Sequence, residues 1–151
     1  MAVTQLIYSS RYRARPESPS HLETLRSILA ASRRNNSAGD LTGFLLFDRP
    51  CFFQILEGEH DEVITTYNRI QQDPRHDSIQ LLAMRQANTR SFPQWSMGGA
   101  LRSEEQQEIF LRHGLSGGID PAKVAAPTVL SLAIDLQDFE ITRRESLLSA
   151  N

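Results

Sequence analysis

Tyr8 and Gln54 are the two side chains whose types and positions are best suited to carry out chemistry. Tyr8 lies in the middle of TQLIYSS (residues 4–10), and Gln54 lies in CFFQILEG (residues 51–58), an otherwise apolar run that places an amide where a core side chain would stand. A phenol can be oxidised, whereas a carboxamide carries a donor and an acceptor at opposite ends. If two strands brought the pair together, hydrogen bonds could therefore be rearranged without a change in net charge.

A second interpretation of the same pair is structural. A buried Gln54 without partners would cost about 1 to 3 kcal/mol. Buried polar groups are usually paired, so a core tyrosine and glutamine that satisfy each other's hydrogen bonds would explain the pattern equally well. Spacing alone leaves both interpretations open.

Asn35 and Asn36 offer two neighbouring amides, a combination that suits a flat ring with donors and acceptors on its edge. The alternative is a helix C-cap followed by a turn. Arg69 and His76 could bind a phosphate, but the segment 73–76 (DPRH) is also a plausible solvated turn.

Other kinds of catalytic site have little support. The four histidines are widely scattered, and the single cysteine, Cys51, has no partner at metal-ligand spacing. The sequence shows neither a phosphate-binding glycine loop nor a nucleophile elbow.

The elements that must position these side chains follow from hydrophobic periodicity. Helical spacing predicts helices from Ser20 to about Arg34 and from Asp61 to Gln72. Short apolar or β-branched runs predict strands at residues 4–10, 42–47, 51–58, 79–85 and about 95–101. The order β-α-β-β-α-β-β predicts an α+β fold, a ferredoxin-like sandwich that ends near residue 101.

Residues 102–151 are expected to form a C-terminal helical extension. The segment 103–106 (SEEQ) has capping character for a third helix, and residues 114–118 interrupt the chain. A fourth helix carries an apolar stripe of Val129, Leu132, Leu136 and Phe139. This stripe should dock either on the sheet face that the first two helices leave open or on another subunit.

Composition narrows the class of protein further. The 151 residues are 40% hydrophobic and 23% charged, which suits one globular domain with a short appendage and includes no run able to cross a membrane. The start of the chain does not resemble a secretory signal, so a cytoplasmic location is expected. The formal charge of -2 argues against a nucleic-acid partner, despite the local basic group Arg11, Arg13 and Arg15.

Six segments, taken together and in this order, closely resemble the BLUF (blue light using flavin) family, and the match covers about residues 4–101. They are LIYSS (6–10), SRRNN (32–36), LTG (41–43), FFQILEG (52–58), DPRH (73–76) and FPQWSM (92–97). The two trailing helices resemble those of the short, stand-alone members of that family.

The resemblance implies a non-enzymatic photoreceptor that binds FAD, or else FMN or riboflavin, between the first two helices. It implies that Asn36, with Asn35 and Ser32 nearby, holds the ring edge, and that Ile28 and Ile70 enclose the ring plane. It places Arg69, Asp73 and His76 around the ring edge or the phosphate-bearing tail.

The resemblance also implies a mechanism. Blue light would draw an electron and a proton from Tyr8 with Gln54 as the bridge, and a new hydrogen bond would shift the absorption to the red. The change would reach the fifth strand, where Trp95 and Met97 compete for the place beside Gln54. The signal would leave through self-assembly, as a homo-oligomer, or through a separate signalling partner protein.

Two rivals come from other classes of protein. A ferredoxin-like RNA-binding module would use aromatic residues such as Phe44 and Phe47, but no basic sheet face accompanies them. A small hydrolase would hold a phosphate with Arg13 or Arg15 and with Asn35. A yellow purified protein would argue against both rivals.

Overall fold

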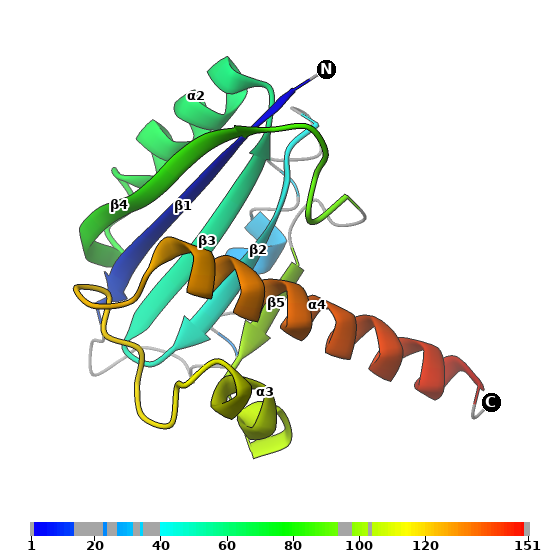
Figure 1. The fold of residues 1–151 in the computed structure, drawn as a ribbon. Coiled ribbons are helices and arrows are strands. Elements are labelled where there is room, and N and C mark those ends of the chain that lie inside the picture. Colours follow the sequence, from blue (N-terminus) through cyan, green and yellow to red (C-terminus); the bar gives the residue numbers. More distant parts are fainter. Residues whose placement is uncertain are drawn as a thin grey trace.

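The computed structural model describes residues 2–13, 23, 27–31, 34, 40–93, 98–102 and 104–149, with side chains as far as residue 140 at the C-terminal end. Within them, five strands form one mixed sheet in the order β4-β1-β3-β2-β5 (Figure 1). All neighbouring strands are antiparallel except β2 and β5, which are parallel. The strands are β1 (Val3–Tyr12), β2 (Thr42–Asp48), β3 (Cys51–Gly58), β4 (His76–Ala87) and β5 (Gly98–Leu101).

Two of these strands are longer than their sequences predict. β1 runs on to Tyr12, and β4 begins at His76 instead of Ile79, because Tyr12 pairs with His76 and Arg11 pairs with Asp77. Pairing between strands far apart in sequence supplies the hydrogen bonds that these polar residues would otherwise make in a loop. The turn expected at His76 is therefore the start of an edge strand.

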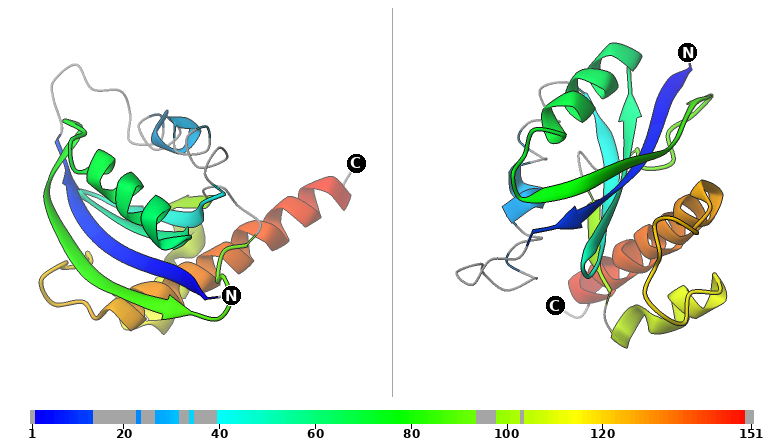
Figure 2. Two further views of the ribbon diagram at one scale, coloured as in Figure 1. Left: turned by 90° about the horizontal axis from the view of Figure 1, so that it is seen from above. Right: turned by 90° about the vertical axis from the view of Figure 1, so that its left-hand side faces the viewer.

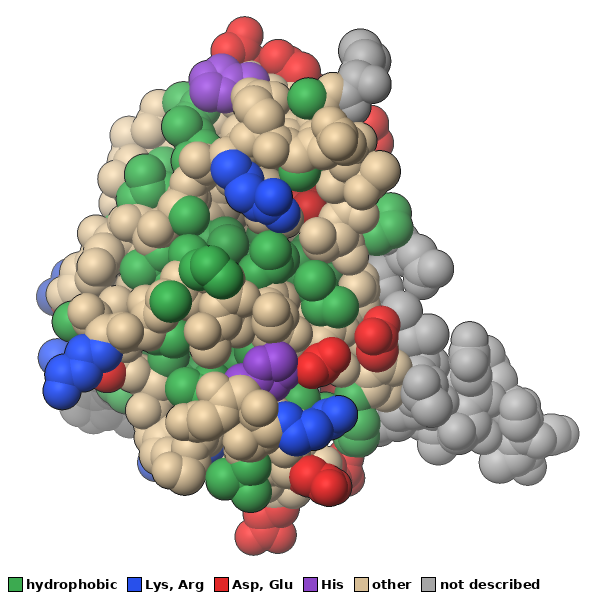
Figure 3. All heavy atoms as spheres, viewed as in Figure 1, with side chains coloured by type: hydrophobic (Ala, Val, Ile, Leu, Met, Phe, Trp, Pro, Cys, Tyr) green, Lys and Arg blue, Asp and Glu red, His purple; other side chains and the backbone are tan. Residues whose placement is uncertain are grey.

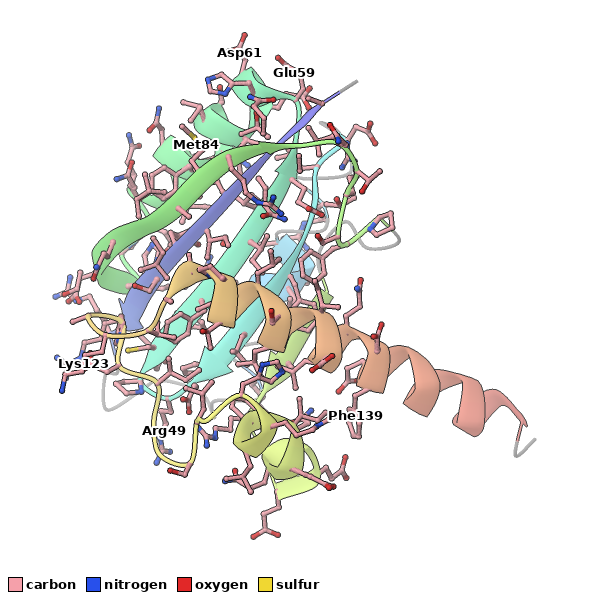
Figure 4. The ribbon with its side chains drawn as sticks, in the orientation of Figure 1. Arg49, Glu59, Asp61, Met84, Lys123 and Phe139 are labelled. Atoms are coloured by element: carbon pink, nitrogen blue, oxygen red, sulfur yellow. The ribbon has the colours of Figure 1, made fainter. Side chains whose placement is uncertain are left out.

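One face of the sheet is covered by α2 (His60–Ile70) and by the first helix, of which residues 23, 27–31 and 34 are described (Figure 2). α2 starts one residue before the expected Asp61 and ends at Ile70, two residues before Gln72. Glu59 caps α2, and Figure 4 shows Glu59 and Asp61 together at that end of the molecule. The buried residues on this face, here called the site-face cluster, are Leu6, Tyr8, Tyr12, Leu29, Leu41, Leu45, Phe47, Phe52, Leu56 and Val63.

The opposite face carries α4 (Ala126–Ser149), with the short helix α3 (Gln107–Arg112) beside it (Figures 1 and 2). A 3-10 turn, Glu104–Gln106, precedes α3. Val129, Leu132 and Leu136 of α4 are at most 1% exposed and pack with sheet residues such as Phe53 and Ile55, while Phe139 packs against them. The expected docking of this stripe on the open sheet face is thereby confirmed, and we call these buried residues the α4-face cluster.

Coverage of both faces explains why β2 and β3 are buried almost throughout. Alternation decides the direction of each side chain: Leu45 and Phe47 enter the site-face cluster, whereas Phe44 and Leu46 enter the α4-face cluster. Phe44 and Phe47 are at most 1% exposed, so they cannot form the open aromatic platform of an RNA-binding sheet.

Gly99 of β5 allows the first helix to approach the sheet closely. A Cβ atom at Gly99 would lie 2.8 Å from both terminal carbons of Leu29 and 3.2 Å from the carbonyl oxygen of Leu45. Leu29 is itself buried in the site-face cluster. The absence of a side chain at Gly99 therefore helps to set the height of the first helix above the sheet.

Candidate functional site

A cavity of about 470 Å³ lies on the site face, between α2, the first helix and the sheet. This volume is in the range of pockets that hold small organic molecules. Its wall combines apolar side chains from both helices and the sheet with polar side chains at one end. The lining residues are Tyr8, Ser10, Ile28, Ala31, Leu45, Phe52, Gln54, Leu56, Thr66, Arg69, Ile70, Gln72, Asp73, Pro74, Arg75 and His76.

Tyr8 and Gln54 meet at the wall that the sheet forms. They are directly opposed in the register of β1 and β3, and the Tyr8 hydroxyl donates a hydrogen bond to Gln54 Oε1. Both side chains are 3% exposed. The ring of Tyr67 in α2 lies against that of Tyr8, with centroids 5.3 Å apart. Strand pairing thus places an oxidisable phenol and a two-ended amide in direct contact.

Burial raises the pKa of Tyr8 far above its ordinary value, and the nearby Tyr67 and Asp73 raise it further. A phenolate would have to form in a site from which water is largely excluded and beside a carboxylate. Tyr8 is therefore a neutral phenol at physiological pH, with a proton available to donate.

Asp73 and Arg75 form a compact ion pair at the polar end of the cavity. Arg75 Nε lies 3.0 Å from Asp73 Oδ1, and Arg75 Nη2 lies 2.6 Å from Oδ2. Burial by itself would raise the pKa of Asp73, but the side-chain and backbone hydrogen bonds from Arg75 outweigh it and leave that pKa below its ordinary value. The carboxylate therefore stays ionised at neutral pH.

His76 joins the end of α2 to β1. Its Nε2 lies 2.7 Å from the carbonyl oxygen of Ile70, which can only accept, so this nitrogen carries a proton. Its Nδ1 lies 2.8 Å from Ser10 Oγ, and in the neutral ring Nδ1 accepts the serine proton. The ring of His76 thus lines the cavity while both of its nitrogens hold secondary structure in place.

The structure brings together every predicted site residue that it describes. Tyr8, Gln54, Ile28, Arg69, Ile70, Asp73 and His76 all line the cavity. Ser32, Asn35, Asn36, Trp95 and Met97 lie outside the described residues.

Sequence reasoning missed some of the cavity. Thr66 and Arg75 line it but were not among the predicted site residues, although Thr66 is one helical turn before Ile70 and shares its face of α2. Their spacing from predicted site residues was the available signal. Alternation places Phe52 and Leu56 on the face of Gln54, although they were not named as site residues, and Leu45 joins them through the register of β2 with β3.

The described part of the chain supports neither a metal site nor a membrane-spanning helix. No group of three or more histidine, cysteine, aspartate or glutamate side chains there could hold a metal ion. Among the same residues, no helix has the length and apolar character needed to span a membrane.

Comparison with known proteins gives a consistent result. Residues 3–98 match the model of the BLUF family, described as sensors of blue light using FAD. Over 90 residues the chain is 38% identical to the blue light- and temperature-regulated antirepressor BluF of Escherichia coli, a match that covers 60% of this chain and 21% of that protein. It is 36% identical over 87 residues to the photoactivated adenylate cyclase subunit beta of Euglena gracilis, covering 57% of this chain and 10% of the relative. The matched segment is thus a small part of either relative.

Solved structures agree over more of the chain. BlsA in its photo-activated state superposes with a TM-score of 0.77 at 29% identity, covering 89% of this chain and 94% of that one. BlrB in its dark state superposes with a TM-score of 0.67 at 30% identity, covering 87% and 96%. Both coverages extend beyond the sheet into the C-terminal helices, and the fold is ferredoxin-like as predicted. With the family model matched from the first strand to the start of the last, this chain belongs to the BLUF family of blue-light sensors that use FAD.

Proposed function

We propose that this protein is a blue-light receptor that binds FAD in the cavity between α2 and the first helix, and that Tyr8 and Gln54 form its photochemical switch. The observation that carries the proposal is the hydrogen bond between these two buried side chains at the wall of a cavity of about 470 Å³. A merely structural pair would not require a cavity beside it.

The residues present fit a flat, mostly apolar ring with a polar edge. Ile28 of the first helix and Ile70 of α2 supply apolar walls from two different elements. Arg69 and the Asp73–Arg75 pair supply charge at the polar end, where a polar edge or a phosphate-bearing tail would lie. We assign the amides of Asn35 and Asn36, with Ser32, to the ring edge on the strength of the family resemblance, and we regard FMN or riboflavin as alternative ligands.

When bound, FAD supplies absorption of blue light and an excited state that accepts an electron and a proton. Tyr8 is suited to donate both, because burial keeps its phenol protonated and its hydroxyl already points to a hydrogen-bond acceptor. Its proton would pass along the hydrogen bond to Gln54 Oε1 while Gln54 Nε2 gave up one of its own protons, so that the amide would stay neutral, and the proton could return by the same route. Tyr8 is therefore the donor of the proposed switch.

Gln54 is suited to maintain a rearranged set of hydrogen bonds after the light reaction. In the described arrangement its amide oxygen accepts from Tyr8, so the donor end of the carboxamide points elsewhere. Rotation or tautomerisation of the amide exchanges donor for acceptor without creating a buried charge. An ionised glutamate at this position could only accept hydrogen bonds and could not make that exchange.

In this proposal the signal leaves through contacts between proteins. We propose as the receiver either a second copy of the chain or a separate partner protein in the cytoplasm, with Trp95 and Met97 as relay residues. Support comes from relatives in which a matching segment belongs to a larger protein, such as a photoactivated adenylate cyclase subunit. In this proposal the chain itself turns over no substrate.

Absorption spectroscopy of the purified protein tests the proposal. The protein should be yellow, should release FAD on denaturation, and should show a red-shifted band under blue light that reverts in the dark. A colourless preparation that takes up neither FAD, FMN nor riboflavin would overturn the proposal.

A further inference from the structure

The ladder between β1 and β3 carries a second polar pair besides Tyr8 and Gln54. Gln5 and Glu57 are also register partners, and Gln5 Nε2 donates to Glu57 Oε2 over 2.9 Å. The two pairs are three residues apart on both strands, so they project from opposite faces of the sheet. The first pair borders the cavity, whereas the second lies on the face that carries α4.

Glu57 uses both carboxylate oxygens to hold the turn that follows β4. Its Oε2 accepts from the backbone N–H of Ser91 at 2.8 Å, and its Oε1 accepts from the backbone N–H of Phe92 at 2.8 Å. Arg90, in the same turn, donates to the backbone carbonyl of Glu57 at 3.2 Å. Glu57 is 0% exposed, so these hydrogen bonds form away from water.

The same turn is joined to α4. Gln137 Nε2 donates to the carbonyl oxygen of Ser91 over 3.1 Å, and Gln137 is 6% exposed. Phe92 is fully buried in the α4-face cluster and stacks on Phe44. Figure 3 views this face, where hydrophobic side chains gather near the middle among scattered charged groups. A continuous polar path therefore runs from β3 through the turn at residues 91–92 to α4.

Apolar packing alone would fix α4 to the sheet, because Leu132 and Leu136 are fully buried. A buried carboxylate makes the contact sensitive to small displacements. Its burial is costly unless donors converge on it with good geometry, so its hydrogen bonds depend on the relative positions of the groups that it joins. A small displacement of β3 against the turn would therefore change the contacts of Glu57 more than those of a leucine.

We propose that Glu57 is a positioning residue that couples the switch at Gln54 to α4 through the turn at residues 91–92. Gln54 and Glu57 share one strand, separated by about 10 Å of extended backbone. A change in the hydrogen bonding of Gln54 displaces β3 slightly. The displacement alters the hydrogen bonds of Glu57 to the turn, and through Ser91 it changes the contact of the turn with Gln137. This inference rests on the proposed function, because it requires a light-driven change at Gln54.

The test uses the full chain with bound FAD and compares three variants by absorption and by hydrogen exchange in the dark and under blue light. Glu57→Gln replaces one acceptor oxygen with a donor that cannot accept from the Ser91 or Phe92 N–H. Gln137→Leu removes only the last link, between the turn and α4. The matched control is Asp135→Asn, which alters a polar contact of α4 with His113, 2.7 Å away, outside this path.

In wild type we expect blue light to produce the red shift and to change the exchange rates of α4 amides around Gln137. Glu57→Gln should keep FAD and the red shift, because the cavity lies on the other face, but should lose the light-dependent change in α4. Gln137→Leu should keep the light-dependent change at the turn and lose it in α4. Asp135→Asn should keep both.

The outcomes separate the two proposals. A wild-type protein without a red shift overturns the proposed function and this inference together. A red shift with no light-dependent change in α4, or with a change that survives either Glu57→Gln or Gln137→Leu, overturns only the inference. Loss of the change in Asp135→Asn as well would show general loosening of α4 and would also overturn it. If Glu57→Gln does not fold, Gln137→Leu with its control decides.

Discussion

Tyr8 and Gln54 face each other across the antiparallel ladder of β1 and β3, and the hydroxyl of Tyr8 donates its hydrogen bond to the amide oxygen of Gln54. Because both are 3% exposed, neither can exchange its partner for bulk water. If the hydrogen bonding of Tyr8 or Gln54 changes, the new hydrogen-bond partner must therefore come from the other residue of the pair or from a group in the cavity.

Gln54→Leu tests the role of the amide. Leucine has a similar volume but neither a donor nor an acceptor, so the cavity should keep its shape and FAD should stay bound. The long-lived red shift should vanish, because no amide remains to hold a rearranged hydrogen bond. Absorption spectra before and after blue light measure this. A Gln54→Leu protein that binds FAD and still shows the full red shift would remove Gln54 from the mechanism.

Tyr8→Phe tests the protonation state of the phenol through stability at high pH. Burial raises the pKa of Tyr8 above its ordinary value of 10.0. The unfolded chain therefore loses this proton near pH 10 while the folded chain keeps it, so the free energy of unfolding falls as pH rises, by up to about 1.4 kcal/mol per pH unit. Below pH 10 this contribution is fully present.

The measurement is urea denaturation of both proteins from pH 8 to 11. Wild type should lose stability above about pH 10 more steeply than Tyr8→Phe, which lacks the titrating group. At neutral pH, Tyr8→Phe should cost about 0.5 to 1.5 kcal/mol through the lost hydrogen bond to Gln54. Identical slopes for the two proteins would contradict a buried, neutral Tyr8.

Gly99→Ala tests the close approach of the first helix to the sheet. The new methyl group would lie 2.8 Å from the terminal carbons of Leu29 and must displace that side chain. Overpacking of this kind costs about 1 to 3 kcal/mol. Because Ile28 is the neighbour of Leu29 and lines the cavity, the affinity for FAD should also fall.

Denaturation and FAD titration measure both effects of Gly99→Ala. Gly117→Ala is the matched control, since nothing lies within 4 Å of the Cβ that it would add. The control should keep wild-type affinity for FAD. Equal affinities for all three proteins would show that Leu29 yields without moving the cavity wall.

Leu132→Ala tests the docking of α4. Leu132 is fully buried in the α4-face cluster, and truncation there should cost about 2 to 5 kcal/mol. Leu111→Ala, in α3, is the control, because Leu111 is 51% exposed and its truncation should change stability by no more than about 0.5 kcal/mol. Chemical denaturation gives both values. Similar losses in the two variants would mean that α4 is not held on the sheet as described.

Much of this site could be predicted from local patterns. Alternation in residues 51–58 predicts that Gln54 shares a face with Phe52 and Leu56, and the same rule predicts that Tyr8 shares a face with Leu6. Helical spacing identified Ile70 and the stripe from Val129 to Phe139 as buried faces. These patterns are readable because the direction of a side chain within one strand or helix depends only on the backbone period.

Tertiary structure decided which faces meet. The sequence by itself determined that Tyr8 and Gln54 are polar residues on core faces, but only the register of β1 with β3 put them in contact, and only the fold placed the stripe of α4 on the sheet and not on another subunit. Glu57 shows most clearly how little the local sequence reveals about the partners of a buried side chain. Its sequence neighbours suggest an ordinary strand end, yet donors from residue 5 and from residues 91 and 92 converge on its carboxylate. A buried charge is stabilised by partners distant in the chain. Strand pairing and loop closure bring these partners close, and local hydrophobic periodicity does not predict either of them.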